Sequence, residues 1–99
     1  MRQFLIRYRT TPDQAGNNEK LVRAVFAELA QVQPDELGYA TFKLADQVTF
    51  LHLVRAPQLP SPLVQVKAFG EFQAGIADRY EQPPVREELT MLGSYRMFG

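Results

Sequence analysis

The segment Val48-Thr49-Phe50-Leu51-His52-Leu53-Val54 is apolar at nearly every position, which limits the folds open to the chain. In an extended strand its residues alternate between two faces, with Val48, Phe50, His52 and Val54 on one and Leu51 and Leu53 on the other. A sheet in a small protein with two helices is covered by them on only one face. We therefore expect a second subunit or a ligand cavity to cover the other face of this strand.

The hydrophobic spacing along the chain switches between the period of a strand and that of a helix. The pattern predicts, in order, strand 3–10, helix 18–33, a hairpin of strands 38–44 and 47–55, helix 63–80, a short helical turn at 85–90 and a final strand 92–98.

Several residues indicate where the helices begin and end. Asn17 or Asn18 is a suitable cap for the first helix, and Pro34 ends it, because the residue before a proline is disfavoured in helical geometry. Ser61-Pro62 is typical of a helix start, and Pro83-Pro84 is expected to end the second helix.

The predicted order of elements is β-α-β-β-α-β, the ferredoxin-like plan of the α+β class. It implies an antiparallel four-stranded sheet with both helices on one face. The 99 residues suffice for one domain, which we assign to residues 1–99.

Composition argues against several classes of function. Lys+Arg and Asp+Glu are equal at 11 each, so the chain lacks the positive charge on which nucleic-acid binding depends. Cysteine is absent, which excludes disulfides and thiol catalysis. No stretch approaches the roughly 20 apolar residues of a membrane span, and the N-terminus has a strand pattern rather than that of a signal peptide. We expect a cytoplasmic protein with neither a nucleic-acid nor a membrane partner.

Four stretches resemble a known family. They are Phe-Leu-Ile-Arg-Tyr at residues 4–8, the hairpin containing Tyr39-Ala40-Thr41-Phe42 and Thr49-Phe50-Leu51-His52, the helical stretch 68–76, and Gly93-Ser94-Tyr95-Arg96. In these stretches and in the order of its elements, the chain resembles the dimeric α+β barrel superfamily, and within it the antibiotic biosynthesis monooxygenase-like group.

The resemblance implies a homodimer in which two sheets face each other, with a pocket between the sheet and the helices of each subunit. Some relatives are oxygenases that use no metal or flavin and rely on a pocket tryptophan with an asparagine, and others degrade haem. This chain has no tryptophan, and Asn17 and Asn18 are expected in the loop before the first helix. We expect no cofactor.

His52 is the only histidine and the principal candidate for a catalytic residue. Its ordinary pKa near ~6.5 suits a general base, and an axial haem ligand is a second possibility. The alternative is a hydrogen-bonded histidine of the core or of an interface. A dedicated metal site is not expected, because no carboxylate partners are placed beside this histidine by sequence spacing.

Aromatic and basic residues complete the candidate site. We expect a ligand to be bound by Tyr8, Tyr39, Phe50, Phe72 and Arg7. The alternative for the aromatic residues is ordinary core packing, with each buried tyrosine hydroxyl bonded to a partner. The alternative for Arg7 is a solvated charge on the sheet, beside Arg9 on the same face.

Two functions follow from the sequence. The first is a small monooxygenase-like or isomerase-like enzyme acting on an aromatic or polyketide-like molecule, with a cofactor-free oxygenase as the specific hypothesis. The second is a non-catalytic dimer that binds a small hydrophobic molecule or a protein partner.

Overall fold

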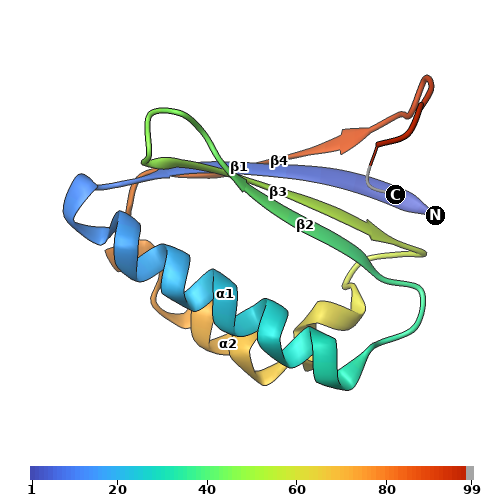
Figure 1. The fold of residues 1–99 in the computed structure, drawn as a ribbon, viewed down its shortest axis with the longest axis horizontal. Helices are drawn as coiled ribbons and strands as arrows, with labels where there is room; N and C mark the ends of the chain where they lie inside the picture. The colour runs from blue at the N-terminus through green and yellow to red at the C-terminus, as the bar shows by residue number, and fades with distance from the viewer. Residues whose placement is uncertain (98–99) are drawn as a thin grey trace.

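A single antiparallel sheet forms the upper layer of the structure (Figure 1). The computed structural model describes residues 1–97 of the chain. The sheet has the strand order β2-β3-β1-β4, with bounds β1 Arg2–Thr10, β2 Gly38–Lys43, β3 Thr49–Ala56 and β4 Tyr80–Leu89. The helices α1, Ala15–Val32, and α2, Lys67–Ala74, both lie on one face of it. The predicted βαββαβ fold is confirmed.

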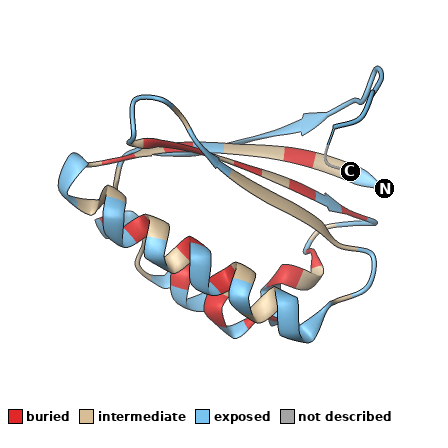
Figure 2. Cartoon of the chain, viewed as in Figure 1, coloured by how far each residue is buried: buried red, intermediate tan, exposed pale blue. Residues whose placement is uncertain are grey.

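The core lies between this face of the sheet and the helices. Figure 2 shows buried positions on the facing sides of the two layers, whereas β4 after its first residue is exposed. The core residues come from β1, β3, both helices and the turn before α2, and they include Tyr8, Val25, Phe50, Leu63 and Phe72. Among residues 1–97, no helix has both the length and the hydropathy required to cross a membrane.

Helix α1 begins earlier than the sequence pattern predicts. A 3₁₀ turn at Pro12–Gln14 leads directly into Ala15, and the residue before the helix, Gln14, makes no side-chain cap. Asn17 and Asn18 therefore lie inside the helix, and their predicted position in a loop or at the cap is wrong. The predicted end is confirmed, since Gln33 adopts a left-handed conformation before Pro34.

The second helical segment is broken into three pieces rather than running continuously from residue 63 to 80. A 3₁₀ helix, Pro62–Gln65, precedes α2, and another, Ile76–Asp78, follows it. The first break is at Val66, which is extended with φ −86° and ψ 117°, and the second is at Gly75. Ser61 accepts a bond from the Leu63 backbone N–H, as expected of a cap.

The last strand was misplaced by the sequence pattern. Pro83-Pro84 does not end a helix but lies within β4, and residues 85–90 are mostly strand rather than a helical turn. Two features make this possible: β4 is an edge strand, and its pairing with β1 shifts register between Arg7 and Arg9, where the prolines fall. Residues 92–97 form no strand, and Phe98 lies outside the described residues.

The outer face of the sheet carries the second set of apolar side chains predicted for β3. Leu53 pairs with Leu5 of β1 and Ala40 of β2, and Leu51 pairs with Phe42. Phe50, His52 and Val54 alternate with these leucines and are buried against the helices. The helices therefore cover one face of β3 and leave its leucines half-buried on the other.

A carboxylate of α1 holds the start of α2. The two side-chain oxygens of Glu28 accept bonds of 2.9 Å from the backbone N–H groups of Lys67 and Ala68. These groups have no partner within the helix, and α2 makes no side-chain cap of its own. Glu28 thus acts as the N-terminal cap of α2 and joins the two helices.

We predict that Glu28→Ala lowers the free energy of unfolding by about 1 kcal/mol, the usual cost of losing a helix cap. Glu71→Ala is the matched control, because it removes the same charge from an exposed position of α2. Urea denaturation of both variants measures the effect. Equal losses in the two would contradict the capping role of Glu28.

Candidate functional site

The imidazole of His52 lies at the centre of a buried polar cluster. It belongs to β3, an inner strand of the sheet, and is only 4% exposed. Its Nε2 lies 2.9 Å from the hydroxyl of Tyr8, and its Nδ1 lies 2.5 Å from the hydroxyl of Tyr39. Thr41 places its Oγ1 3.2 Å from the same Nδ1. Both ring nitrogens therefore have hydrogen-bond partners.

Two further residues extend this cluster toward the helices. The amide nitrogen of Asn18 donates to the Tyr8 hydroxyl at 2.8 Å, and its oxygen accepts from Nε of Arg79 at 3.0 Å. Arg79 is 4% exposed, donates to the carbonyl oxygen of Phe72, and has its guanidinium 5.0 Å from the centre of the Phe72 ring. A continuous chain of hydrogen bonds thus runs from Arg79 to Tyr39. We refer to Arg79, Asn18, Tyr8, His52 and Tyr39 as the polar chain.

Burial keeps the titratable side chains around His52 uncharged at neutral pH. Desolvation lowers the pKa of His52 to about 4, because it penalises the imidazolium form. Desolvation also raises the pKa of Tyr8 to about 12, against the opposing effects of Asn18 and Arg79. The pKa of Tyr39 is raised as well, again chiefly by burial. Neutral hydrogen-bonding groups therefore form this part of the site.

Aromatic rings surround the polar chain. Tyr8 stacks on Phe50 with ring centres 5.6 Å apart, and the ring of Phe72 lies 5.5 Å from that of His52. Tyr39 stacks on Phe26 of α1 at 5.1 Å. These rings bury most of the cluster and provide flat apolar surfaces for packing.

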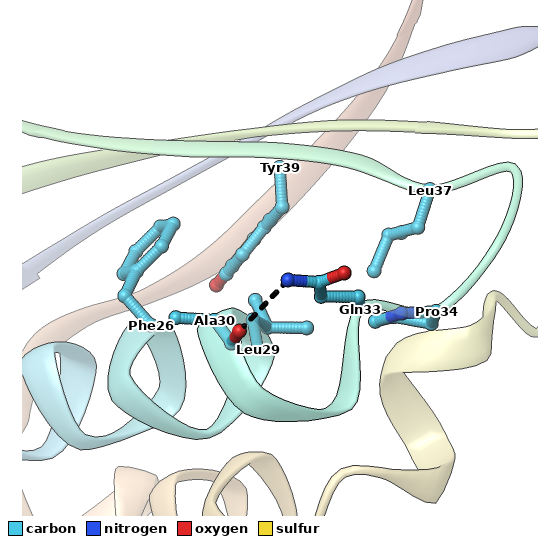
Figure 3. A pocket seen from close by; sticks show the side chains of 7 residues that line it. All are labelled: Phe26, Leu29, Ala30, Gln33, Pro34, Leu37 and Tyr39. Carbon is cyan, nitrogen blue, oxygen red and sulfur yellow. Dashed lines mark hydrogen bonds between the residues drawn. The ribbon is translucent and has the colours of Figure 1, made fainter.

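Two cavities meet at Tyr39. The larger has a volume of about 360 Å³, within the ~300–1,000 Å³ of small-molecule pockets. The smaller, of about 100 Å³, is lined by Tyr8, His52 and Phe72 and has room for about three waters at roughly 30 Å³ each. Figure 3 shows the larger cavity between α1 and the start of β2; it is lined by Phe26, Leu29, Ala30, Gln33, Pro34, Leu37 and Tyr39.

Tyr39 forms part of the wall of both cavities. In Figure 3 its ring extends from β2 toward α1, with the hydroxyl at the end near the helix. A molecule in the larger cavity would therefore meet Tyr39 first, and through it the imidazole of His52. This arrangement can bind a flat apolar molecule and contact one polar group on it.

The structure brings most of the sequence-predicted site residues together. Tyr8, Tyr39, His52 and Phe72 line the smaller cavity, and Phe50 packs behind Tyr8 without lining it. Arg7 is not part of this group. It is exposed and, one residue from Tyr8 on β1, lies on the opposite face of the sheet.

Sequence reasoning missed Asn18 and Arg79. The expectation that Asn18 lies in a loop placed it too far from the pocket, and Arg79 was not among the residues proposed for the site. One signal was available for Asn18, because Leu21, Val22 and Val25 continue from it at helical spacing on the buried face. No local signal distinguishes Arg79 from an exposed arginine.

The described part of the chain has no group of three or more His, Cys, Asp or Glu side chains arranged to hold a metal ion. His52 has no carboxylate beside it, and its nitrogens are bonded to hydroxyl groups. The residues of the polar chain thus suit hydrogen bonding to an organic molecule better than metal ligation.

Comparison with solved structures places this fold among proteins named as antibiotic biosynthesis monooxygenases. A provisionally named protein of this kind from Bacteroides thetaiotaomicron has a TM-score of 0.79 at 11% identity, over 97% of this chain and 94% of its own. Another from Nitrosomonas europaea has a TM-score of 0.77 at 10% identity, over 94% and 100%. The protein Rv0793 from Mycobacterium tuberculosis has a TM-score of 0.74 at 14% identity, over 94% and 96%.

These comparisons confirm the predicted resemblance at the level of the fold. No protein-family model and no curated protein matches the sequence. Identities of 10 to 14% show a shared fold and carry no statement about substrate or reaction. The function must therefore be argued from the site.

The buried state of His52 predicts how stability depends on pH. The pKa is near ~6.5 in the unfolded chain and about 4 in the folded protein, so the unfolded state binds more protons between these values. His52 therefore destabilises the fold as the pH falls from about 6.5 toward 4, with a slope of up to ~1.4 kcal/mol per pH unit. Urea denaturation of the native protein and of His52→Gln across this range measures the free energy of unfolding of each. The difference between the two values is free of the effect of the carboxylates, which both proteins share. Parallel stability curves would show that His52 is not buried as a neutral imidazole.

Proposed function

We propose that the chain binds a small aromatic or polyketide-like molecule between α1 and β2 and oxygenates it. The observation that carries this proposal is the position of Tyr39, which lines a ligand-sized cavity and bonds to the buried imidazole of His52. The names of the proteins that share the fold favour an oxygenase over other reactions.

The lining of the larger cavity supports this class of ligand. Its apolar side chains, with Phe26 stacked on Tyr39, suit a flat ring system. The Tyr39 hydroxyl can bond to a ketone or phenol oxygen on that ring. A molecule of this kind would pack one face of its rings against these side chains and have one oxygen at the polar chain.

Oxygenation of an activated methylene fits a site made only of organic groups. In such a reaction the CH₂ group and O₂ give a carbonyl group and water, so the substrate supplies all the electrons that reduce O₂. One oxygen atom enters the new carbonyl, and the other leaves as water with the two hydrogens. The reaction needs no separate reductant.

A second candidate function is non-catalytic binding of the same kind of molecule. The observation that favours it is that both nitrogens of His52 are bonded inside the protein, at 2.9 Å to Tyr8 and 2.5 Å to Tyr39. No other imidazole is present in the chain. Binding without product formation would be the outcome under this alternative.

We also propose that the protein works as a homodimer joined through the outer faces of its sheets. Leu5, Leu51 and Leu53 lie on that face in neighbouring strands, and Phe42 and Val85 are exposed beside them. A second copy would remove these side chains from water, which is favourable at about 25 cal/mol per Å² of apolar surface.

The function predicts that anthrone, a tricyclic ketone with one activated methylene, binds and is converted to anthraquinone with one O₂ consumed per product. Tyr39→Phe should weaken anthrone binding about 2- to 10-fold, the value of one hydrogen bond. Tyr95→Phe, at a residue that is 78% exposed in the C-terminal tail, is the matched control and should leave binding unchanged. Fluorescence titration and an oxygen electrode provide the two measurements.

The outcomes separate the candidates. Binding without O₂ consumption above the protein-free rate would favour the non-catalytic function. No binding to the native protein, or equal effects of the two tyrosine substitutions, would contradict the proposed site.

The dimer predicts that Leu53→Lys produces a monomer, because a charge would be placed in the centre of the interface. Val64→Lys is the control, since Val64 is exposed on the 3₁₀ helix before α2 and outside the sheet. Sedimentation velocity at micromolar concentration distinguishes the species. A native protein that sediments as a monomer would overturn the proposed assembly.

A further inference from the structure

The polar chain has a fixed direction that begins at Arg79. A guanidinium has only N–H donors, so Arg79 must donate to Asn18, and the atom of Asn18 that faces it must be the oxygen. The other end of the amide is then NH₂, which donates to the Tyr8 oxygen at 2.8 Å. Arg79 therefore determines the orientation of the Asn18 amide.

The same reasoning extends from Tyr8 to His52. The oxygen of Tyr8 already accepts from Asn18, and Tyr8 is only 2% exposed, so its proton is expected to point to a protein group. The remaining partner in reach is Nε2 of His52 at 2.9 Å. Because a buried hydroxyl without a partner is costly, the Tyr8 proton points to Nε2 and this nitrogen is an acceptor.

A neutral imidazole with Nε2 as acceptor carries its proton on Nδ1. That proton faces the oxygen of Tyr39 at 2.5 Å, with Thr41 as a second acceptor at 3.2 Å. The Tyr39 hydroxyl then accepts from His52, and its own proton is directed away from the imidazole. It can be donated to Thr41 or to a molecule in the cavities that Tyr39 lines.

We propose that Arg79 is a positioning residue that, through Asn18 and Tyr8, holds His52 as the Nδ1–H tautomer and presents Tyr39 as the hydrogen-bond donor to a bound molecule. The donor role of Tyr39 toward a bound molecule rests on the proposed function. This donor role also specifies the ligand further, because the ligand atom at Tyr39 must be an acceptor such as a ketone oxygen. His52 supports Tyr39 and does not itself contact the ligand.

The surroundings of Arg79 fit this role. No ion pair involves Arg79 among residues 1–97, so its position is set by Asn18, the carbonyl of Phe72 and the Phe72 ring. Gly75 provides space for the guanidinium, since a Cβ at this position would lie 2.9 Å from Nη1. The hydrogen bonds that Arg79 donates to Asn18 and to Phe72 fix the orientation of its guanidinium, and this orientation sets the direction of the polar chain.

The substitution Asn18→Asp tests this most sharply. A carboxylate at residue 18 accepts from both neighbours, so the Tyr8 hydroxyl turns to donate to it, and the Tyr8 oxygen becomes an acceptor for His52. The tautomer should then reverse to Nε2–H. Asn17→Asp is the matched control, because it adds the same charge at the adjacent exposed residue, whose side chain bonds to Gln14.

Nitrogen-15 NMR reads the tautomer directly, and His52 is the only histidine, so its signals need no assignment. We expect Nδ1–H in the native protein and in Asn17→Asp, and Nε2–H as the major form in Asn18→Asp. A native spectrum with Nε2–H would overturn the proposal without any variant. Nδ1–H retained in a folded Asn18→Asp protein would also overturn it.

The spectrum does not depend on a ligand, so its result is separate from that of the anthrone experiment. If the tautomer is as expected and anthrone fails to bind, the proposed function and the ligand contact of Tyr39 are wrong, and the positioning role of Arg79 stands. If anthrone reacts and the native tautomer is Nε2–H, the function stands and the role of Arg79 is wrong.

Discussion

The burial of one imidazole in the middle of the sheet is the constraint on which the site depends. His52 occupies a position between apolar neighbours on an inner strand, where it is almost fully buried. A buried polar group without a partner is costly, so each nitrogen needs a hydroxyl from a neighbouring strand. Tyr8 of β1 and Tyr39 of β2 supply them, one from each side. The antiparallel pairing of three strands is thereby tied to one cluster of side chains.

The same cluster relates the fold to the proposed function. Tyr8 needs a partner in turn, and Asn18 of α1 supplies it, with Arg79 beyond the end of α2 completing the chain. The sheet and both helical segments therefore meet at this chain of hydrogen bonds. Tyr39, at its other end, borders the cavity that is large enough for a ligand. The groups that stabilise the interior thus reach the place where a molecule can bind.

The parts of the fold that local patterns determine were predicted well. The alternation around Phe50 and Val54 located β3, and the apolar residues of α1 located its buried face, because each depends only on spacing along the chain. The ends were harder to predict. Pro83-Pro84 is usually a sign of a broken element, and its place in β4 depends on a register shift against β1 that the local sequence does not encode.

The candidate site was predicted in its strand residues and in Phe72 of α2, but not in Asn18 or Arg79. His52 was proposed because it is the only histidine and lies in an apolar strand, and Tyr8 and Tyr39 were proposed because they are aromatic residues that carry a hydroxyl. The bond between Asn18 and Arg79 joins residues 61 apart in the sequence, and it exists only because the chain returns from α2 to the start of α1. Contacts of this kind are set by tertiary structure. Arg7, by contrast, was assigned to a ligand from its charge, and the alternation of β1 places it on the other face.

A crystal structure of the protein with anthrone tests the central claim most directly, because it locates the ligand relative to Tyr39 and His52. The account predicts that the rings lie between α1 and β2, with the ketone oxygen within hydrogen-bond distance of the Tyr39 hydroxyl and His52 still bonded to both tyrosines. Anthrone bound elsewhere on the molecule, or bound directly to a displaced His52 side chain, would contradict it.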